Sequence, residues 1–395
     1  MRLLLLPMII IIIINLLVDL YIYKSIRKTV KNKFAAISHT CFSIFLILFI
    51  IIVLVLPKRN GDNDGLVLIM WMLFTYLSIY LSKYIYVIFD ALGGLPSLFK
   101  KNRIKHSRII AVILSGAVFC VLWIGALHTA RTIEVRKVTI ENDHLPKGFD
   151  NFKIVQFSDF HLGTYGSDTT FVSEVVKQIM DLKPDMIIFS GDLVNRQTTE
   201  LYPFTGVLRQ LHAPYGVYSV LGNHDYGDYK DWPSISAKKH NNDEFKQLQA
   251  KMGWVMLNNS SKIIYNHGDS IAVIGVENWG DPPFPKYGNL NKAYKNSNDS
   301  VYKVLISHNP CHWDAEVVPK TNIDLMLAGH THAMQVELDI LGERYSPAIL
   351  RYKEWGGLYT KGKQNLYVNI GLGEVALPMR IGAVPEITLI TLKRK

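Results

Sequence analysis

Four long apolar stretches in the first third of the chain restrict its fold more than any other feature of the sequence. They span Leu3–Tyr23, Phe34–Pro57, Leu66–Phe89 and Ile109–Leu127. Each approaches the ~20 residues that an α-helix needs to cross the hydrocarbon core of a bilayer. Only 19% of all residues are charged, whereas soluble domains carry about 25%. The sequence therefore predicts four transmembrane helices within residues 1–128, and an integral membrane protein.

The net charge of +10 arises entirely in this apolar part. Residues 1–130 contain 14 basic and 4 acidic side chains, and the rest of the chain contains 29 of each. Most of the basic residues lie in two segments, 24–33 and 100–108. Because basic loops stay on the cytoplasmic side of a membrane, both termini and the large C-terminal part are predicted to be extracytoplasmic. This distribution points to the lipid bilayer as partner, and no nucleic-acid partner is expected.

Three charged residues interrupt the apolar stretches: Asp19, Lys83 and Asp90. We expect them near the ends of the spans, where charged groups reach the interface. A transport function would require charges in the middle of the spans, so the sequence does not favour a transporter.

After His128 the pattern changes to short β-branched runs that alternate with amphipathic segments. Strands are predicted at residues 153–159, 185–192, 216–222, 301–307, 322–329, 365–370 and 386–392, with a hairpin at 261–276. Helices are predicted at about 168–182, 200–211 and 242–252. This order predicts an α/β domain over residues 151–395. Residues 129–150 would hold a linker and a first strand.

Five of these strands run into polar clusters. The clusters contain Asp159 and His161, Asp192, Asn223 with His224 and Asp225, His308, and His330 with His332. In α/β sheets the carboxyl ends of strands meet in one crevice, so we expect the clusters to converge. Two carboxylates, one amide oxygen and four imidazoles, without a thiolate, suit Mn²⁺, Fe²⁺/Fe³⁺ or Zn²⁺. Seven ligands are too many for one ion with open positions, but they suit two divalent ions that share a bridging carboxylate.

The ordered series D-x-H, G-D, G-N-H-D, H and G-H-x-H closely resembles the calcineurin-like metallophosphoesterase family. The leading ligands are separated by 33, 31, 85 and 22 residues, and the resemblance covers about residues 150–392. The tail LYVNIGLG…LPMRIGAVPEITLITL is similar to the membrane-associated bacterial branch, the transmembrane proteins with a metallophosphoesterase domain. The resemblance implies a two-sheet β-sandwich core flanked by helices, following the transmembrane region, and a bacterial inner-membrane location.

The resemblance also implies a role for each residue of the series. It places Asp159, His161 and His332 on a first metal ion, Asn223, His308 and His330 on a second, and Asp192 between the two. His224 would face the substrate, and Asp225 would orient or polarise His224. In the expected reaction a metal-bridged hydroxide attacks phosphorus, while His224 protonates or stabilises the leaving oxygen.

Predictions for substrate contacts rest on less. Arg380 is a candidate bidentate donor to a substrate phosphate, and His312 is a candidate for lining the site. Related proteins have two glycines before Gln335, where this chain has Ala333 and Met334. The loop-rich, aromatic residues 279–285 and 340–360 are candidates for a lid that faces lipid.

These observations lead to one main functional hypothesis and two alternatives. The main hypothesis is a membrane-anchored, metal-dependent phosphoric ester hydrolase acting on a phosphodiester or pyrophosphate that can be lipid-borne. One alternative is an enzyme similar to the UDP-2,3-diacylglucosamine pyrophosphatases of lipid A metabolism; the extracytoplasmic orientation argues against it, because nucleotide sugars are cytoplasmic. The other is a non-catalytic membrane receptor or scaffold, for which degenerate ligand positions would be expected.

Overall fold

The computed structural model describes residues 2–56, 61–282, 284–294 and 300–395. The chain forms two compact units. The first contains Met1–Lys58 and Leu68–Gly125, and the second contains Arg59–Val67 and Ala126–Lys395.

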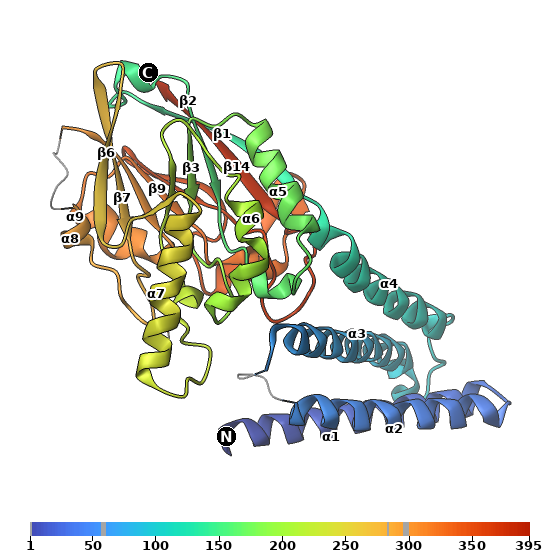
Figure 1. The fold of residues 1–395 in the computed structure, drawn as a ribbon. Helices are drawn as coiled ribbons and strands as arrows, with labels where there is room; N and C mark the ends of the chain where they lie inside the picture. Colours follow the sequence, from blue (N-terminus) through green and yellow to red (C-terminus); the bar gives the residue numbers. More distant parts are fainter. Residues whose placement is uncertain (1, 57–60, 283, 295–299) are drawn as a thin grey trace. The chain divides into compact units, whose positions relative to one another are not determined.

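Four long helices make up the membrane part of the chain (Figure 1). They are α1 (Arg2–Thr29), α2 (Lys33–Val55), α3 (Asn63–Gly94) and α4 (Ser107–Leu127). By length and composition all four are able to cross a membrane, with candidate spans Ile9–Thr29, Lys33–Val55, Asn63–Phe99 and Ser107–Arg131. The prediction of four transmembrane helices is confirmed.

Asp19 and Lys83 lie further from the ends of their helices than the sequence indicated. The α1 helix continues beyond Tyr23 to Thr29, and its candidate span runs from Ile9 to Thr29, so Asp19 falls in the middle. Lys83 likewise falls in the interior of the third span, and its Nζ atom lies 2.7 Å from Asp19 Oδ1. The two charges pair with each other inside the bundle.

The described residues of the C-terminal unit contain two six-stranded sheets and a two-stranded hairpin. The first sheet has the order β1-β14-β2-β3-β4-β5, the second has the order β12-β13-β9-β8-β7-β6, and β10 pairs with β11. The strands are β1 (Glu134–Asn142), β2 (Phe152–Phe157), β3 (Met186–Phe189), β4 (Val217–Ser219), β5 (Trp254–Met256), β6 (Ser260–Asn266), β7 (Asp269–Val276), β8 (Tyr302–Ser307), β9 (Leu325–Ala328), β10 (Leu338–Ile340), β11 (Glu343–Tyr345), β12 (Gly357–Lys361), β13 (Gln364–Val368) and β14 (Glu386–Arg394). The helices are α5 (Thr170–Asp181), α6 (Thr205–Leu208), α7 (Ile235–Lys251), α8 (Leu290–Tyr294) and α9 (Val318–Lys320).

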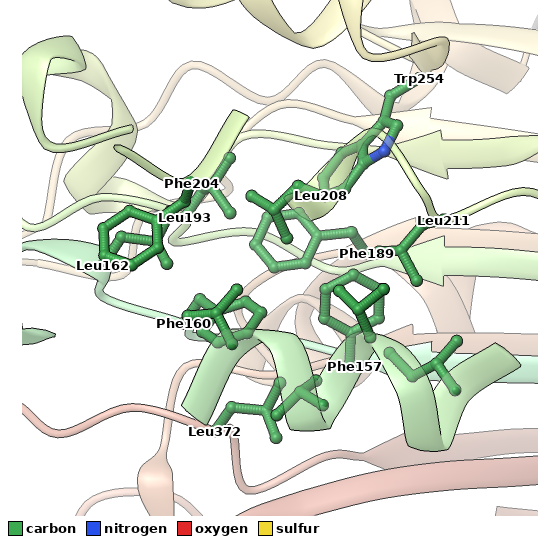
Figure 2. Close-up of a cluster of buried hydrophobic side chains, with 14 of the residues drawn as sticks. Phe157, Phe160, Leu162, Phe189, Leu193, Phe204, Leu208, Leu211, Trp254 and Leu372 are labelled. Carbon is green, nitrogen blue, oxygen red and sulfur yellow. The ribbon is translucent and has the colours of Figure 1, made fainter. Parts of the chain in front are cut away.

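Successive side chains along each strand point to opposite faces of the sheet, and this alternation divides the core into layers. Ile154 of β2 and Ile306 of β8 belong to one buried cluster, so the two sheets pack face to face. Val155, the neighbour of Ile154, points to the other side of its sheet, where helices α5 and α7 cover it. Figure 2 shows this outer cluster, which includes Phe157, Phe189 and Trp254. The α/β fold with a two-sheet core flanked by helices is thereby confirmed.

Two details differ from the sequence prediction. The helix expected at about 200–211 is mostly a 3₁₀ segment, Thr198–Phe204, followed by the single turn of α6. Pro203 lies inside this segment and lacks the N–H that a continuous α-helix requires. Strands β5 and β12 and the β10–β11 hairpin were not predicted, because three to five residues are too few for a recognisable alternation.

Candidate metal centre

The ends of five strands bring the predicted ligands together. Strands β2, β3 and β4 are parallel neighbours in the first sheet, and β8 and β9 are parallel neighbours in the second. Their carboxyl ends therefore open at one edge of each sheet. The loops that follow them carry, in chain order, Asp159 with His161, Asp192, Asn223 with His224, His308, and His330 with His332. This convergence is the arrangement that the sequence predicted.

A first group of donor atoms consists of Asp159, His161 and His332. The Nε2 atoms of His161 and His332 lie 3.1 Å apart, and His332 Nε2 lies 3.3 Å from Asp159 Oδ1. All three side chains are buried.

A second group consists of Asp192, His308 and His330. His308 Nε2 lies 3.1 Å from Asp192 Oδ2 and 3.1 Å from His330 Nδ1. The same Asp192 oxygen lies 3.8 Å from His161 Nε2 in the first group. Asp192 thus stands between the two groups, which is the position of a bridging ligand.

The donor atoms fit divalent metal ions. Two nitrogens that each lie about 2.1 Å from one ion are about 3 Å apart at the angles of tetrahedral or octahedral sites, and both imidazole pairs have this spacing. Asn223 provides further evidence, because its buried Oδ1 atom has no hydrogen-bond partner while its Nδ2 donates to the Tyr229 hydroxyl at 2.8 Å. An unsatisfied buried carbonyl oxygen is costly unless it binds a ligand.

The electrostatics of the groups favour metal-ready protonation states. Burial alone would raise the pKa values of Asp159 and Asp192, but the imidazoles that face them hold both pKa values below the usual range. Burial lowers the pKa of His330 to about 3, and burial with the nearby His224 lowers the pKa of His161 well below its usual value. Neutral imidazoles and charged carboxylates are the forms that bind metal. His308 is the exception: burial alone would lower its pKa, but the charge of Asp192 raises it to about 9, so His308 must lose a proton when it binds a metal ion.

The backbone at these positions is strained. Asp159, His161 and His332 have φ values of 52°, 49° and 49°, in the left-handed region that non-glycine residues rarely adopt. Such strain is stored preferentially at functional sites. Two glycines permit the close approach of the loops: a Cβ on Gly329 would lie 2.3 Å from Asp159 Oδ2, and one on Gly191 would lie 2.7 Å from His308 Nδ1.

His224 forms a third group of possible donor atoms with His161 and Asp192. Its Nδ1 atom lies 2.7 Å from the carbonyl oxygen of Asn195, so this carbonyl accepts the Nδ1 proton and leaves Nε2 free. The ring stacks on Tyr229 with centroids 4.2 Å apart. One nitrogen of His224 lies within 4.8 Å of donor atoms of His161 and Asp192. The ring is therefore oriented by a carbonyl and an aromatic face.

Asp225 makes different contacts from those expected. Its buried carboxylate accepts hydrogen bonds from the main-chain N–H groups of Asp192 (2.9 Å), Leu193 (2.8 Å), Val194 (3.2 Å) and Gly222 (2.9 Å). Burial and the charge of Asp192 raise the pKa of Asp225 to about 7, while the donors favour the charged form. The Asn195 carbonyl, and not Asp225, orients the His224 ring. Asp225 holds the loop that carries Asp192.

The structure corrects the prediction for Arg380. The side chain is fully buried, and its guanidinium donates to the main-chain carbonyls of Ile370, Gly373 and Ala383. Its Nη2 atom also lies 3.3 Å from His332 Nδ1. These contacts occupy the five N–H groups of an arginine, so none is left for a substrate phosphate.

The His312 side chain also differs from its prediction as a residue that lines the site. It is fully buried, its Nδ1 atom lies 2.9 Å from Ser307 Oγ, and its ring stacks on Trp279 with centroids 5.2 Å apart. Burial lowers its pKa to about 4. These contacts make His312 a packing residue next to the loop that begins at His308.

Two tyrosines that the sequence did not single out as site residues contact the ligands. Tyr229 accepts from Asn223, as described above, and the Tyr352 hydroxyl lies 3.0 Å from His330 Nε2. The only sequence signal for Tyr352 was its place in the aromatic 340–360 segment. Ala333 and Met334, which replace glycines, adopt φ values of 51° and 46°, so the loop keeps a left-handed conformation without glycine.

Comparisons with known proteins agree with this geometry. The family model "Calcineurin-like phosphoesterase" matches residues 152–334, and "Probable Calcineurin-like phosphoesterase, transmembrane domain" matches residues 1–130. An uncharacterized metallophosphoesterase of Bacillus subtilis, YkuE, is 34% identical over 270 residues, which cover 66% of this chain and 86% of the relative. The chain belongs to the calcineurin-like phosphoesterase family. It is a membrane metallophosphoesterase, a phosphoester hydrolase with an N-terminal four-helix membrane domain.

Two further relatives have different names. The "Transmembrane protein with metallophosphoesterase domain" of Danio rerio is 27% identical over 411 residues, covering 96% of this chain and 87% of the relative. A UDP-2,3-diacylglucosamine pyrophosphatase of Chlamydia muridarum is 27% identical over 299 residues, covering 64% of this chain and 87% of the relative. The architecture with both domains is therefore present in a vertebrate relative as well.

Proposed function

We propose that this metallophosphoesterase uses two divalent ions, Mn²⁺, Fe²⁺/Fe³⁺ or Zn²⁺, to hydrolyse a phosphodiester or pyrophosphate carried by a lipid. One observation carries the proposal: two groups of buried imidazole and carboxylate donors face each other with Asp192 between them. Asp159, His161 and His332 would hold one ion. Asn223, His308 and His330 would hold the other, with Asp192 shared between the two.

In this proposal the protein's own side chains position the ions and move a proton. When bound, the ions would lower the pKa of a water and neutralise charge on the phosphoryl oxygens. His224, fixed through its Nδ1 by the Asn195 carbonyl, would present Nε2 to the leaving oxygen and protonate it. Asp225 would keep the Asp192 loop in place through its four main-chain bonds.

An exposed apolar surface next to the site supports a lipid-borne substrate. Met334, two residues after His332, is 44% exposed, and the hairpin that follows exposes Leu338, Ile340 and Leu341. Leu341 is fully exposed at the turn of the hairpin, with a left-handed φ of 58°. Exposed apolar side chains that gather on one segment are typical of surfaces that contact protein or membrane. We propose that this surface contacts the acyl part of the substrate.

The orientation of the domain bears on which lipid is cleaved. The basic segments 24–33 and 100–108 favour a cytoplasmic side for both loops, and hence an extracytoplasmic domain, in a bacterial inner membrane. A UDP-2,3-diacylglucosamine pyrophosphatase activity, as named for the Chlamydia relative, would require access to cytoplasmic nucleotide sugars. Reporter fusions at the C-terminus test this point. A cytoplasmic C-terminus would favour the pyrophosphatase activity over hydrolysis of an extracytoplasmic lipid. A non-catalytic receptor is disfavoured, because none of the seven ligand positions is degenerate.

The test is turnover by the full chain purified in neutral detergent. We expect hydrolysis of bis-p-nitrophenyl phosphate with Mn²⁺ or Zn²⁺, abolished by a chelator and by Asp192→Asn. The ratio to p-nitrophenyl phosphate turnover measures the preference for diesters over monoesters. Absence of both metal binding and turnover in the native chain would refute the proposal.

His224→Asn separates the proton donor from the ligands. We expect kcat to fall by about 10²–10⁴-fold, typical of a lost general acid, with Mn²⁺ affinity unchanged. His240→Asn is the matched control, because His240 is an exposed histidine of α7 outside both donor groups. Loss of Mn²⁺ binding in His224→Asn would instead make His224 a metal ligand, contradicting its assigned role.

A further inference from the structure

The membrane helices contain a buried charged network in the middle of the spans. Asp19 of α1 is 7% exposed and pairs with Lys83 Nζ of α3 at 2.7 Å. The Tyr80 hydroxyl donates to its other carboxylate oxygen at 2.9 Å, and His39 Nε2 of α2 lies 3.1 Å from its main-chain oxygen. Ionisable residues inside a membrane are costly and usually functional. The bundle therefore does more than supply apolar length.

A second charged cluster lies at the end of the bundle that carries the basic loops. The buried Asp90 carboxylate pairs with Arg103 and lies 3.5 Å from Arg108 Nε. Arg108 Nη1 donates to Thr29 Oγ1 at 3.0 Å, while its buried Nε makes no hydrogen bond. Together the two clusters hold Lys83 and two arginines against two carboxylates. One positive charge is left in excess.

A cavity of about 540 Å³ is lined by one cation from each cluster. Arg108 and Thr29 line it together with Lys83 and His39. Its remaining wall is largely apolar and includes Ile26 of α1 and Ile113 of α4. This volume lies within the range of small-molecule sites. A cavity with a cationic, hydroxyl-bearing part and isoleucine walls matches an amphiphile with an anionic head.

We propose that this cavity binds the phosphate headgroup of an anionic lipid from the surrounding bilayer. The excess positive charge and the Arg108 guanidinium that lines the cavity would recognise the phosphate, because guanidinium groups bind phosphate through charge-assisted hydrogen bonds. The apolar walls would accept the proximal acyl chains. Basic pockets between transmembrane helices are a known mode of headgroup recognition. The site lies wholly in the membrane unit and does not depend on the chemistry of the metal centre.

The experiment measures lipid binding to the full chain in neutral detergent by native mass spectrometry. The probes are phosphatidylglycerol, phosphatidylcholine and inorganic phosphate. We expect phosphatidylglycerol to bind more tightly than phosphatidylcholine, and Arg108→Gln to weaken it about tenfold, as expected for a lost charge-assisted hydrogen bond. Lys105→Gln is the matched control: it removes the same charge three residues away, from an exposed side chain outside the cavity.

Three results with the native chain, Arg108→Gln and Lys105→Gln would overturn the proposal. These are equal binding of the two lipids, equal weakening by Arg108→Gln and Lys105→Gln, and displacement of phosphatidylglycerol by inorganic phosphate, which would indicate a soluble anion. Thr29→Val provides a second variant if Arg108→Gln fails to fold. It removes only the hydroxyl that accepts from Arg108, and unchanged phosphatidylglycerol binding in a folded Thr29→Val chain would also overturn the proposal.

Discussion

Removal of the Asp225 carboxylate should disturb the candidate metal centre strongly, although Asp225 is not one of the proposed metal ligands. It is buried and accepts four main-chain hydrogen bonds that join the Asp192 loop to Gly222. One oxygen accepts from Leu193 and Val194, and the other accepts from Asp192 and Gly222. The Asp225→Asn substitution keeps the shape of the side chain but leaves only one acceptor oxygen.

The cost follows from the two N–H groups that would face the new amide. Each buried donor without an acceptor costs about 1–3 kcal/mol, so Asp225→Asn should lower the free energy of unfolding by about 2–6 kcal/mol. Displacement of the loop should also weaken Mn²⁺ binding, because Asp192 is the side chain shared between the two donor groups.

Thermal unfolding and Mn²⁺ titration of the full chain in detergent measure both effects. Asp168→Asn is the matched control, since Asp168 is exposed and accepts one hydrogen bond, from the Thr170 N–H at 2.9 Å, which asparagine can also accept. This control should change stability by less than about 0.5 kcal/mol. If Asp225→Asn keeps the stability and Mn²⁺ affinity of the native chain but loses turnover, Asp225 acts on His224 or the substrate, and the reasoning is refuted.

Three more predictions concern other buried or strained positions. Burial raises the pKa of Glu200 from 4.5 to about 7, so the folded chain should lose about 3 kcal/mol of stability as pH rises from 4.5 through 7. Thermal melts of Glu200→Gln should lack this decline. Parallel stability–pH profiles of the native chain and the variant would contradict the prediction. Met334→Gly should be about 1 kcal/mol more stable than Met334→Ala, because only glycine relieves a φ of 46°, and equal melting temperatures would count against strain there. Arg380→Met should lower stability by about 3–5 kcal/mol and weaken Mn²⁺ binding about 10–100-fold through His332; a raised KM with unchanged stability and metal affinity would restore the substrate-contact role.

Much of the fold could be predicted because its signals are local. The seven strands expected from short β-branched runs are all present, and the helix pattern failed mainly where Pro203 interrupts it. The shortest strands were missed because alternation over three residues carries little information. The metal-centre residues were visible for a similar reason: each follows a strand directly, and parallel strands bring their ends together.

The partners of buried charged side chains could not be predicted in this way. Asp225 binds main-chain N–H groups more than 30 positions earlier in the chain, and Arg380 contacts His332, 48 positions earlier. Asp19 meets Lys83 across the helix bundle. Sequence alone thus determined the membrane helices, the α/β class and which polar side chains converge at the candidate metal centre, because these depend on periodicity and on strand ends. Only tertiary packing decided which buried charged group meets which partner. A charged side chain that leaves water must find a hydrogen-bonding or oppositely charged partner, and in the folded chain that partner comes from a distant part of the sequence.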